Sequence, residues 1–300
     1  MSTDITTDTP TADPAGLPYR PSAAPTARFR HLVAAEWIKF WSLRSTALVL
    51  AAGALATLGI CVNAARVNAD RLAHQPGLPP VPPGGRPALP QMVYDPLGAA
   101  YVSPAWALLM IIVAALGASV IFGEYTSGLI RTTFAAVPDR RAVVAAKATV
   151  VGAVTLVLGV AVSGGSFGVT QAILRDHHGM SLADPGALRA VTASALLVPL
   201  CALIGMAVGA LVRHTAGAVV TVIALLLLVP QLFGGEQYRW VVEIGNAMPL
   251  TAWDRLILNP DRDYDLGRYP VTITEAWCVY GAWSAVAVAV TVCVVGRRDV

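Results

Sequence analysis

The sequence predicts an all-α polytopic membrane protein with six transmembrane helices, an N-terminal amphipathic helix and both termini in the cytoplasm. Three observations predict this class. Apolar residues make up 56% of the 300-residue chain and charged residues only 13%, against about 45–50% and about 25% in ordinary soluble domains. The apolar residues are concentrated in six windows that contain no Asp, Glu, Lys, Arg or His. Between these windows, the basic residues favour alternate connections.

The six windows are long enough to cross a bilayer. We expect the spans at about residues 45–65, 103–123, 148–171, 190–212, 215–235 and 276–296. A helix rises 1.5 Å per residue, so about 20 apolar residues cross the hydrocarbon core of about 30 Å. Six apolar helices without a polar face would leave nothing to cover the outside of a soluble core.

The charge distribution predicts the orientation. With the N-terminus inside, the cytoplasmic pieces hold 12 of the 21 Lys and Arg and 7 of the 18 acidic residues. The inside is then 12 − 7 = +5 and the outside 9 − 11 = −2, and short cytoplasmic loops are the ones that carry the basic excess. We therefore expect a multi-pass protein of the cell membrane. Residues 1–27, polar and rich in Thr and Pro, are expected to be a disordered cytoplasmic tail, which leaves residues 28–300 for the six-span domain.

The segment before the first span has a helical pattern. Basic residues occupy positions between its apolar ones, which recur at three- and four-residue spacing and are Phe29, Leu32, Val33, Trp37, Phe40 and Trp41. Such a pattern favours an amphipathic helix that lies flat in the headgroup layer. The alternative is a simple anchor that flanks the first span.

The connection between the second and third spans concentrates charge. It holds Glu124, Arg131, Asp139, Arg140, Arg141 and Lys147. A short basic connection belongs on the cytoplasmic side, and it is the best candidate surface for a partner protein. Residues 124–134 can form a short helix parallel to the membrane, and Pro138 with Asp139 predicts the start of the next helix.

Several other stretches give weaker indications of helix packing and of the structure of the external connections. G-x-x-x-G occurs at residues 164–168 and 205–209, a spacing that lets helices approach closely in lipid. The Pro-rich connection 66–95 is expected to be extended. Residues 236–275 contain apolar positions at helical spacing. They predict either two short helices that dip into the outer leaflet or an ordinary structured loop.

The sequence lacks the motifs that most catalytic and ligand-binding functions require. No Gly-Lys-Ser/Thr phosphate loop occurs, and the +3 charge without a basic, aromatic-rich stripe argues against nucleic-acid binding. The acidic run at residues 261–265 lacks the Gly and Glu of a calcium loop, and His177–His178 has no third metal ligand at convincing spacing. The six windows hold no ionisable relay for proton coupling. Any transport must therefore draw energy from a partner.

Four motifs carry a resemblance. E-W-I-K-F-W-S-L-R-S-T (36–46), G-E-Y-T-S-G-L-I-R-T-T (123–133) and P-D-R-R before a Lys-bearing helix (138–147) resemble the membrane (permease) subunits of type-2 ABC exporters of the actinobacterial kind. N-A-M-P-L-T-A-W (246–253) is similar to the external segment before the last span of that family.

The resemblance implies a transport subunit, not an enzyme, with no cofactor on this chain. ATP and Mg would bind a separate ABC ATPase subunit, and the permease would pair with a second copy or with a related permease. It implies an elbow helix formed by Phe29, Leu32, Val33, Glu36, Trp37, Phe40 and Trp41. It also implies a coupling helix for the ATPase formed by Glu124, Tyr125, Thr126, Ser127, Gly128, Leu129, Ile130 and Arg131.

Two other functions remain open on the sequence. One is a membrane-embedded enzyme whose site is drawn from Asp254, Asp261, Asp263, Asp265, His177 and His178. The other is a structural or sensory membrane protein that transports nothing. The apolar spans do not identify a cargo, because every spanning helix is apolar.

Overall fold

The computed structural model describes residues 28–42, 44–74, 95–126, 139–177, 179–212, 214–233 and 238–297, and every regular element in these ranges is helical. Five helices are long and apolar enough to cross a membrane. They are α2 (Arg44–Ala73), α4 (Ser103–Thr126), α6 (Arg140–Ile173), α7 (Ala187–Val212) and α12 (Ile273–Arg297). The prediction of an all-α chain with several apolar spans is therefore confirmed in this coarser form.

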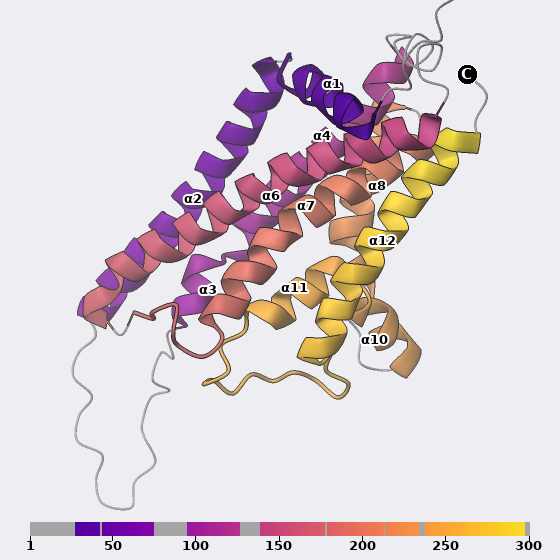
Figure 1. Ribbon diagram of the computed structural model, residues 1–300. Coiled ribbons are helices and arrows are strands. Elements are labelled where there is room, and N and C mark those ends of the chain that lie inside the picture. The colour runs from indigo at the N-terminus through magenta and orange to yellow at the C-terminus, as the bar shows by residue number, and fades with distance from the viewer. Residues whose placement is uncertain are drawn as a thin grey trace, which may run out of the picture.

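The shorter elements gather at the two ends of the bundle or complete it. They are α1 (Phe29–Ser42), α3 (Pro96–Ala100), the 3₁₀-helix η1 (Arg175–His177), α8 (Thr215–Ile223), the π-helix η2 (Ala224–Leu228), α9 (Val229–Leu232), α10 (Arg239–Asn246) and α11 (Pro249–Ile257). Figure 1 shows α1, the start of α6 and the end of α12 at one end, and α3, α10 and α11 toward the other. The first and last described helices therefore end on the same side of the bundle.

All five long helices extend beyond their predicted spans, and α2 and α6 do so by eight residues at one end. α2 continues from the predicted end at residue 65 to Ala73, and α6 begins at Arg140 where the span was expected to begin at residue 148. A charge-free window predicts only the apolar part of a helix, whereas the helical hydrogen bonds continue through the charged residues beside it. The predicted helix start at Asp139 is confirmed, because its carboxylate accepts a hydrogen bond from the Ala142 amide at 3.1 Å.

The fifth predicted span, residues 215–235, differs from the others. Its residues form a continuous helical run through α8, η2 and α9, in which the apolar part, Ala216–Leu232, is shorter than the five long helices. The count of six spans therefore stays a prediction. Downstream, the two short helices expected in residues 236–275 are present as α10 and α11, and their depth in a bilayer also stays a prediction.

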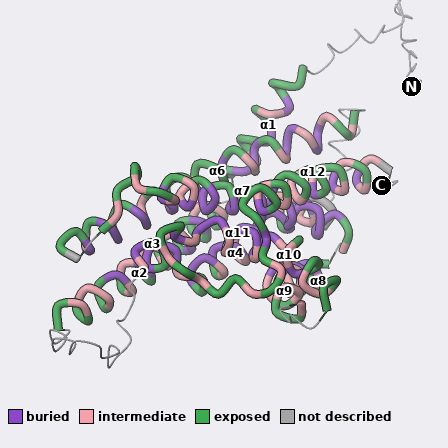
Figure 2. The backbone as a smooth tube through the Cα atoms, turned by 90° about the horizontal axis from the view of Figure 1, so that it is seen from below, coloured by how far each residue is buried: buried purple, intermediate pink, exposed green. Residues whose placement is uncertain are grey.

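Helix α7 lies at the centre of the fold. It packs against α4, α6, α8, α11 and α12, and it is the most buried of the five long helices. In α2 and α12, only 22% of the residues in the most apolar segment are buried. Figure 2 shows the exposed residues along α1 and α2 at the periphery. In lipid, exposed apolar surface on outer helices is the expected arrangement.

Small residues let α7 approach its neighbours closely. A Cβ atom at Gly205 would collide with the carbonyl oxygen of Ala114 on α4, and one at Gly209 would lie 2.6 Å from the Ala118 oxygen. The 205–209 motif therefore acts as predicted. At the 164–168 motif, a Cβ at either glycine would meet no atom within 4 Å among the described residues of this chain, so a close approach there stays a prediction.

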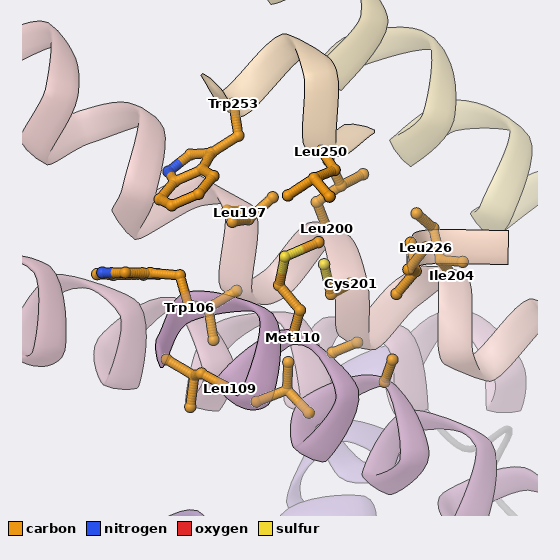
Figure 3. Close-up of a cluster of buried hydrophobic side chains, with 14 of the residues drawn as sticks. Trp106, Leu109, Met110, Leu197, Leu200, Cys201, Ile204, Leu226, Leu250 and Trp253 are labelled. Atoms are coloured by element: carbon orange, nitrogen blue, oxygen red, sulfur yellow. The ribbon is translucent and has the colours of Figure 1, made fainter. Parts of the chain in front are cut away.

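The core continues from α4 and α7 to the short helix α11. Figure 3 shows Trp106 and Met110 of α4, Leu200 and Cys201 of α7 and Trp253 of α11 within one apolar cluster. The rings of Trp106 and Trp253 lie 5.8 Å apart between centroids. The Trp253 indole N–H donates to the Ser194 hydroxyl at 2.9 Å, so the polar atom of this buried ring has a partner.

Candidate functional site at the α1–α6 contact

Helix α1 packs against the first turns of α6 through a narrow stripe. Leu32 and Glu36 are buried one helical turn apart, and Leu32 forms a small apolar cluster with Val143 and Ala146 of α6. Phe40 continues the stripe by a further turn and joins the main core. Residues four apart lie above one another on a helix, so this row is the face that α1 presents to the protein.

The structure divides the apolar residues predicted for this helix between two faces. Leu32, Phe40 and partly Val33 pack against the protein, whereas Phe29, Trp37 and Trp41 are 48%, 48% and 44% exposed. Only part of the predicted apolar face therefore packs against the protein, and the position of this helix in the headgroup layer stays a prediction. The exposed tryptophans lie 5.9 Å apart between ring centroids and remain available to the surroundings, as a helix in the headgroup layer requires.

A buried ion pair lies in the middle of the packed stripe. The ammonium of Lys147 donates to Glu36 Oε2 at 2.5 Å, and the two side chains are only 6% and 5% exposed. The Lys39 ammonium donates to the other oxygen, Oε1, at 2.8 Å. Both oxygens of this buried carboxylate are therefore satisfied by cations, as a buried charge requires.

Sequence reasoning missed this pair. It treated Lys147 as one more basic residue of the connection and gave Glu36 no role of its own. Two signals were present: Glu36 is the only acidic residue between Asp13 and Asp70, and Lys147 is the last charge before a long charge-free window. An isolated acid on an apolar helical stripe, and an isolated lysine at a span boundary, each require a partner when buried.

The predicted coupling segment adjoins this contact along the chain but is described only at its edge. The backbone of residues 124–126, which are Glu124, Tyr125 and Thr126, continues α4 to its end. Ser127, Gly128, Leu129, Ile130 and Arg131 lie outside the described residues, so the coupling helix stays a prediction. The description resumes at Asp139, which caps α6 two turns before Lys147.

The opposite end of the bundle carries an open cavity of about 750 Å³ with a mixed polar and apolar lining. It lies between the start of α3, the α6–α7 connection and the segment after α11. Its lining residues are Pro96, Gly179, Met180, Asp184, Pro185, Asn259, Asp261, Arg262 and Asp263.

Hydrogen bonds tie the three walls of this cavity together. The Gln171 side chain donates to the Pro96 carbonyl at 2.9 Å and accepts from the Met180 amide at 2.8 Å. The Tyr264 hydroxyl donates to the Asp95 carboxylate at 2.7 Å. Burial and the adjacent Asp95 carboxylate raise the pKa of Tyr264 to about 12, so the phenol remains a donor at neutral pH.

Of the residues proposed for an embedded enzyme, the structure places Asp261 and Asp263 in the lining of this cavity. Asp254 lies in α11, and exposed Asp265 accepts from the Gly267 amide. His177 ends η1, and His178 lies outside the described residues. Within the part of the chain that the structure describes, no group of three or more His, Cys, Asp or Glu residues is arranged to hold a metal ion.

Comparison with known proteins does not assign this chain to a family. The sequence matches no protein-family model and no curated protein. Any functional conclusion therefore rests on the residues and geometry of this chain.

Proposed function

We propose that this chain is the transmembrane permease subunit of an ATP-driven exporter of the ABC-2 type. In this proposal the chain forms the substrate pathway and binds a separate ATPase subunit through residues 124–131. ATP and Mg bind that partner, not this chain. The working transporter contains a second permease, either a copy of this chain or a related one, in the cell membrane.

The observation that carries the proposal is the Glu36–Lys147 contact. α6 is the helix that follows the predicted coupling segment, and α1 is the predicted elbow helix. The buried ion pair and the Leu32 cluster join these two helices near the start of α6. A force applied to the coupling segment would therefore move α1 and α6 together, which suits a subunit driven from its cytoplasmic face.

Two further features support six crossings with both termini inside. The run from α8 to α9 leads from the end of α7 toward α10 at the other end of the bundle (Figure 1). Its 18 residues, at 1.5 Å each, extend about 27 Å, close to the thickness of the hydrocarbon core. With six crossings, the basic residues near α1, α6 and α12 fall on the cytoplasmic side.

Capture of the tagged chain from its native membrane tests the proposal. We expect a nucleotide-hydrolysing subunit to co-purify and to hydrolyse ATP in the complex. Arg131→Glu should abolish this association while membrane insertion stays intact, because reversal of a charge at an interface is costly. Arg268→Glu, an exposed arginine at the opposite end, is the matched control.

Three results would contradict the proposal. They are co-purification that Arg131→Glu leaves unchanged, transport without any nucleotide-hydrolysing companion, and labelling of residue 131 from outside the cell.

A further inference from the structure

The π-helix η2 interrupts an otherwise α-helical run in the fifth predicted span. The Val229 amide donates to the carbonyl of Ala224, five residues back, where an α-helix would use the residue four back. The α-helical pattern resumes at once, because the Phe233 amide donates to the Val229 carbonyl at 3.2 Å. The run therefore contains one extra residue within a single turn, a feature that is common at functional sites.

Pro230 explains the position of this turn. Proline has no amide hydrogen, so residue 230 cannot donate to the carbonyl of Leu226, and in α geometry its ring would collide with that carbonyl. A wider turn removes the collision. Pro199 shows that proline alone does not force this outcome, because α7 passes through it with every residue still α-helical.

Residues before and after the π turn differ in how far they are buried. Leu226 is fully buried in the main core, whereas Leu228 and Leu232 are 55% and 77% exposed. Beyond the turn, a cavity of about 140 Å³ lies beside Pro230 and Phe233, with Gly245 and Asn246 of α10 on its other wall. α9 therefore has few inward contacts and adjacent space into which its end can move.

α10 would follow a movement of α9. The Phe233 carbonyl lies so close to Gly245 that a Cβ atom there would be 2.8 Å from the oxygen. The end of α10 is in turn attached to the last span: Trp283 of α12 donates to the Ala247 carbonyl at 2.7 Å. Asn246 also donates to the Tyr269 carbonyl at 2.9 Å.

We propose that η2 is a hinge at which α9 and α10 move relative to α8, by bending where the π turn and Pro230 interrupt the α-helical hydrogen bonds. In the proposed exporter this motion opens the external end of the pathway. That gating role rests on the proposed function, whereas the hinge itself does not.

Hydrogen exchange of the full-length chain in lipid nanodiscs tests the hinge. We expect the amides of residues 226–229 and 231–233 to exchange faster than those on either side of Pro199. Pro230→Ala restores the missing donor, so the α register becomes accessible and these amides should exchange about fivefold more slowly, the effect of one hydrogen bond. Pro199→Ala is the matched control and should leave residues 226–233 unchanged.

The outcomes separate the hinge from its gating role. Equal protection around Pro199 and Pro230 in the wild-type chain would overturn the hinge, whether or not a variant folds. So would a folded Pro230→Ala chain with unchanged exchange. In the complex with an ATPase, nucleotide trapping with vanadate should alter exchange at residues 226–233. An unaltered pattern there would refute the gate alone, and failure to find any ATPase would refute the proposed function alone.

Discussion

The carboxylate of Glu36 and the ammonium of Lys147, 111 residues apart in the chain, meet at 2.5 Å in a buried contact between α1 and α6. Removal of two charges from water is expensive, so such a pair contributes little net stability when it is intact. Loss of one partner, in contrast, leaves a buried charge without compensation. The contact is therefore sensitive to single substitutions at either position.

We expect Lys147→Met to destabilise the protein by about 3 kcal/mol, because it leaves the buried Glu36 carboxylate with Lys39 alone. The double variant Glu36→Gln with Lys147→Met should recover a large part of this loss, since neither charge remains. Thermal unfolding in detergent measures both effects. As the control, Glu243→Gln removes an exposed ion pair with Arg239 and should cost less than about 1 kcal/mol. Equal melting temperatures for wild type and Lys147→Met would show that the contact is unimportant.

Close helix packing predicts a contrast between two glycines. Gly205→Ala should separate α4 from α7, because the new methyl group collides with the Ala114 carbonyl. Gly164→Ala meets open space and should stabilise its helix by up to about 1 kcal/mol. Size-exclusion profiles and melting temperatures of the two variants test this. A Gly205→Ala protein as stable as wild type would argue against the close approach of α4 and α7.

The pH dependence of stability should report on Asp254. Burial raises the pKa of this carboxyl from 3.8 to about 6. Between about pH 4 and 6, the folded protein therefore keeps a proton on Asp254 that the unfolded chain has already lost. As the pH rises through this range, the free energy of unfolding falls. Above pH 6, the buried carboxylate is charged and lowers the free energy of unfolding by about 3 kcal/mol, which corresponds to a pKa shift of roughly two units.

Asp254→Asn should therefore melt at a higher temperature than wild type at pH 7, and the difference should shrink as the pH falls toward 4. Melting curves between pH 4 and 7.5 measure it. Asp265→Asn, which changes an exposed carboxylate, is the control and should leave the pH profile unchanged. A constant difference between wild type and Asp254→Asn across this range would contradict the assignment.

The sequence by itself determined the helical class, the approximate positions of the long apolar helices and the start of α6. These features depend on interactions within one segment: apolar length against bilayer thickness, and a carboxylate beside the first free amides of a helix. The Gly205 motif was visible for the same reason, although its partner on α4 was not.

Only the tertiary structure decided which side chains meet. It divided the aromatic residues of α1 into packed and exposed groups, paired Glu36 with Lys147, and placed Asp261 and Asp263, but not Asp254, in the lining of the cavity. Each outcome depends on the rotation and depth of one helix against another, and a one-dimensional pattern does not specify either. A charge acquires its role here from the partner that packing brings to it, because a buried ion without such a partner is too costly to retain.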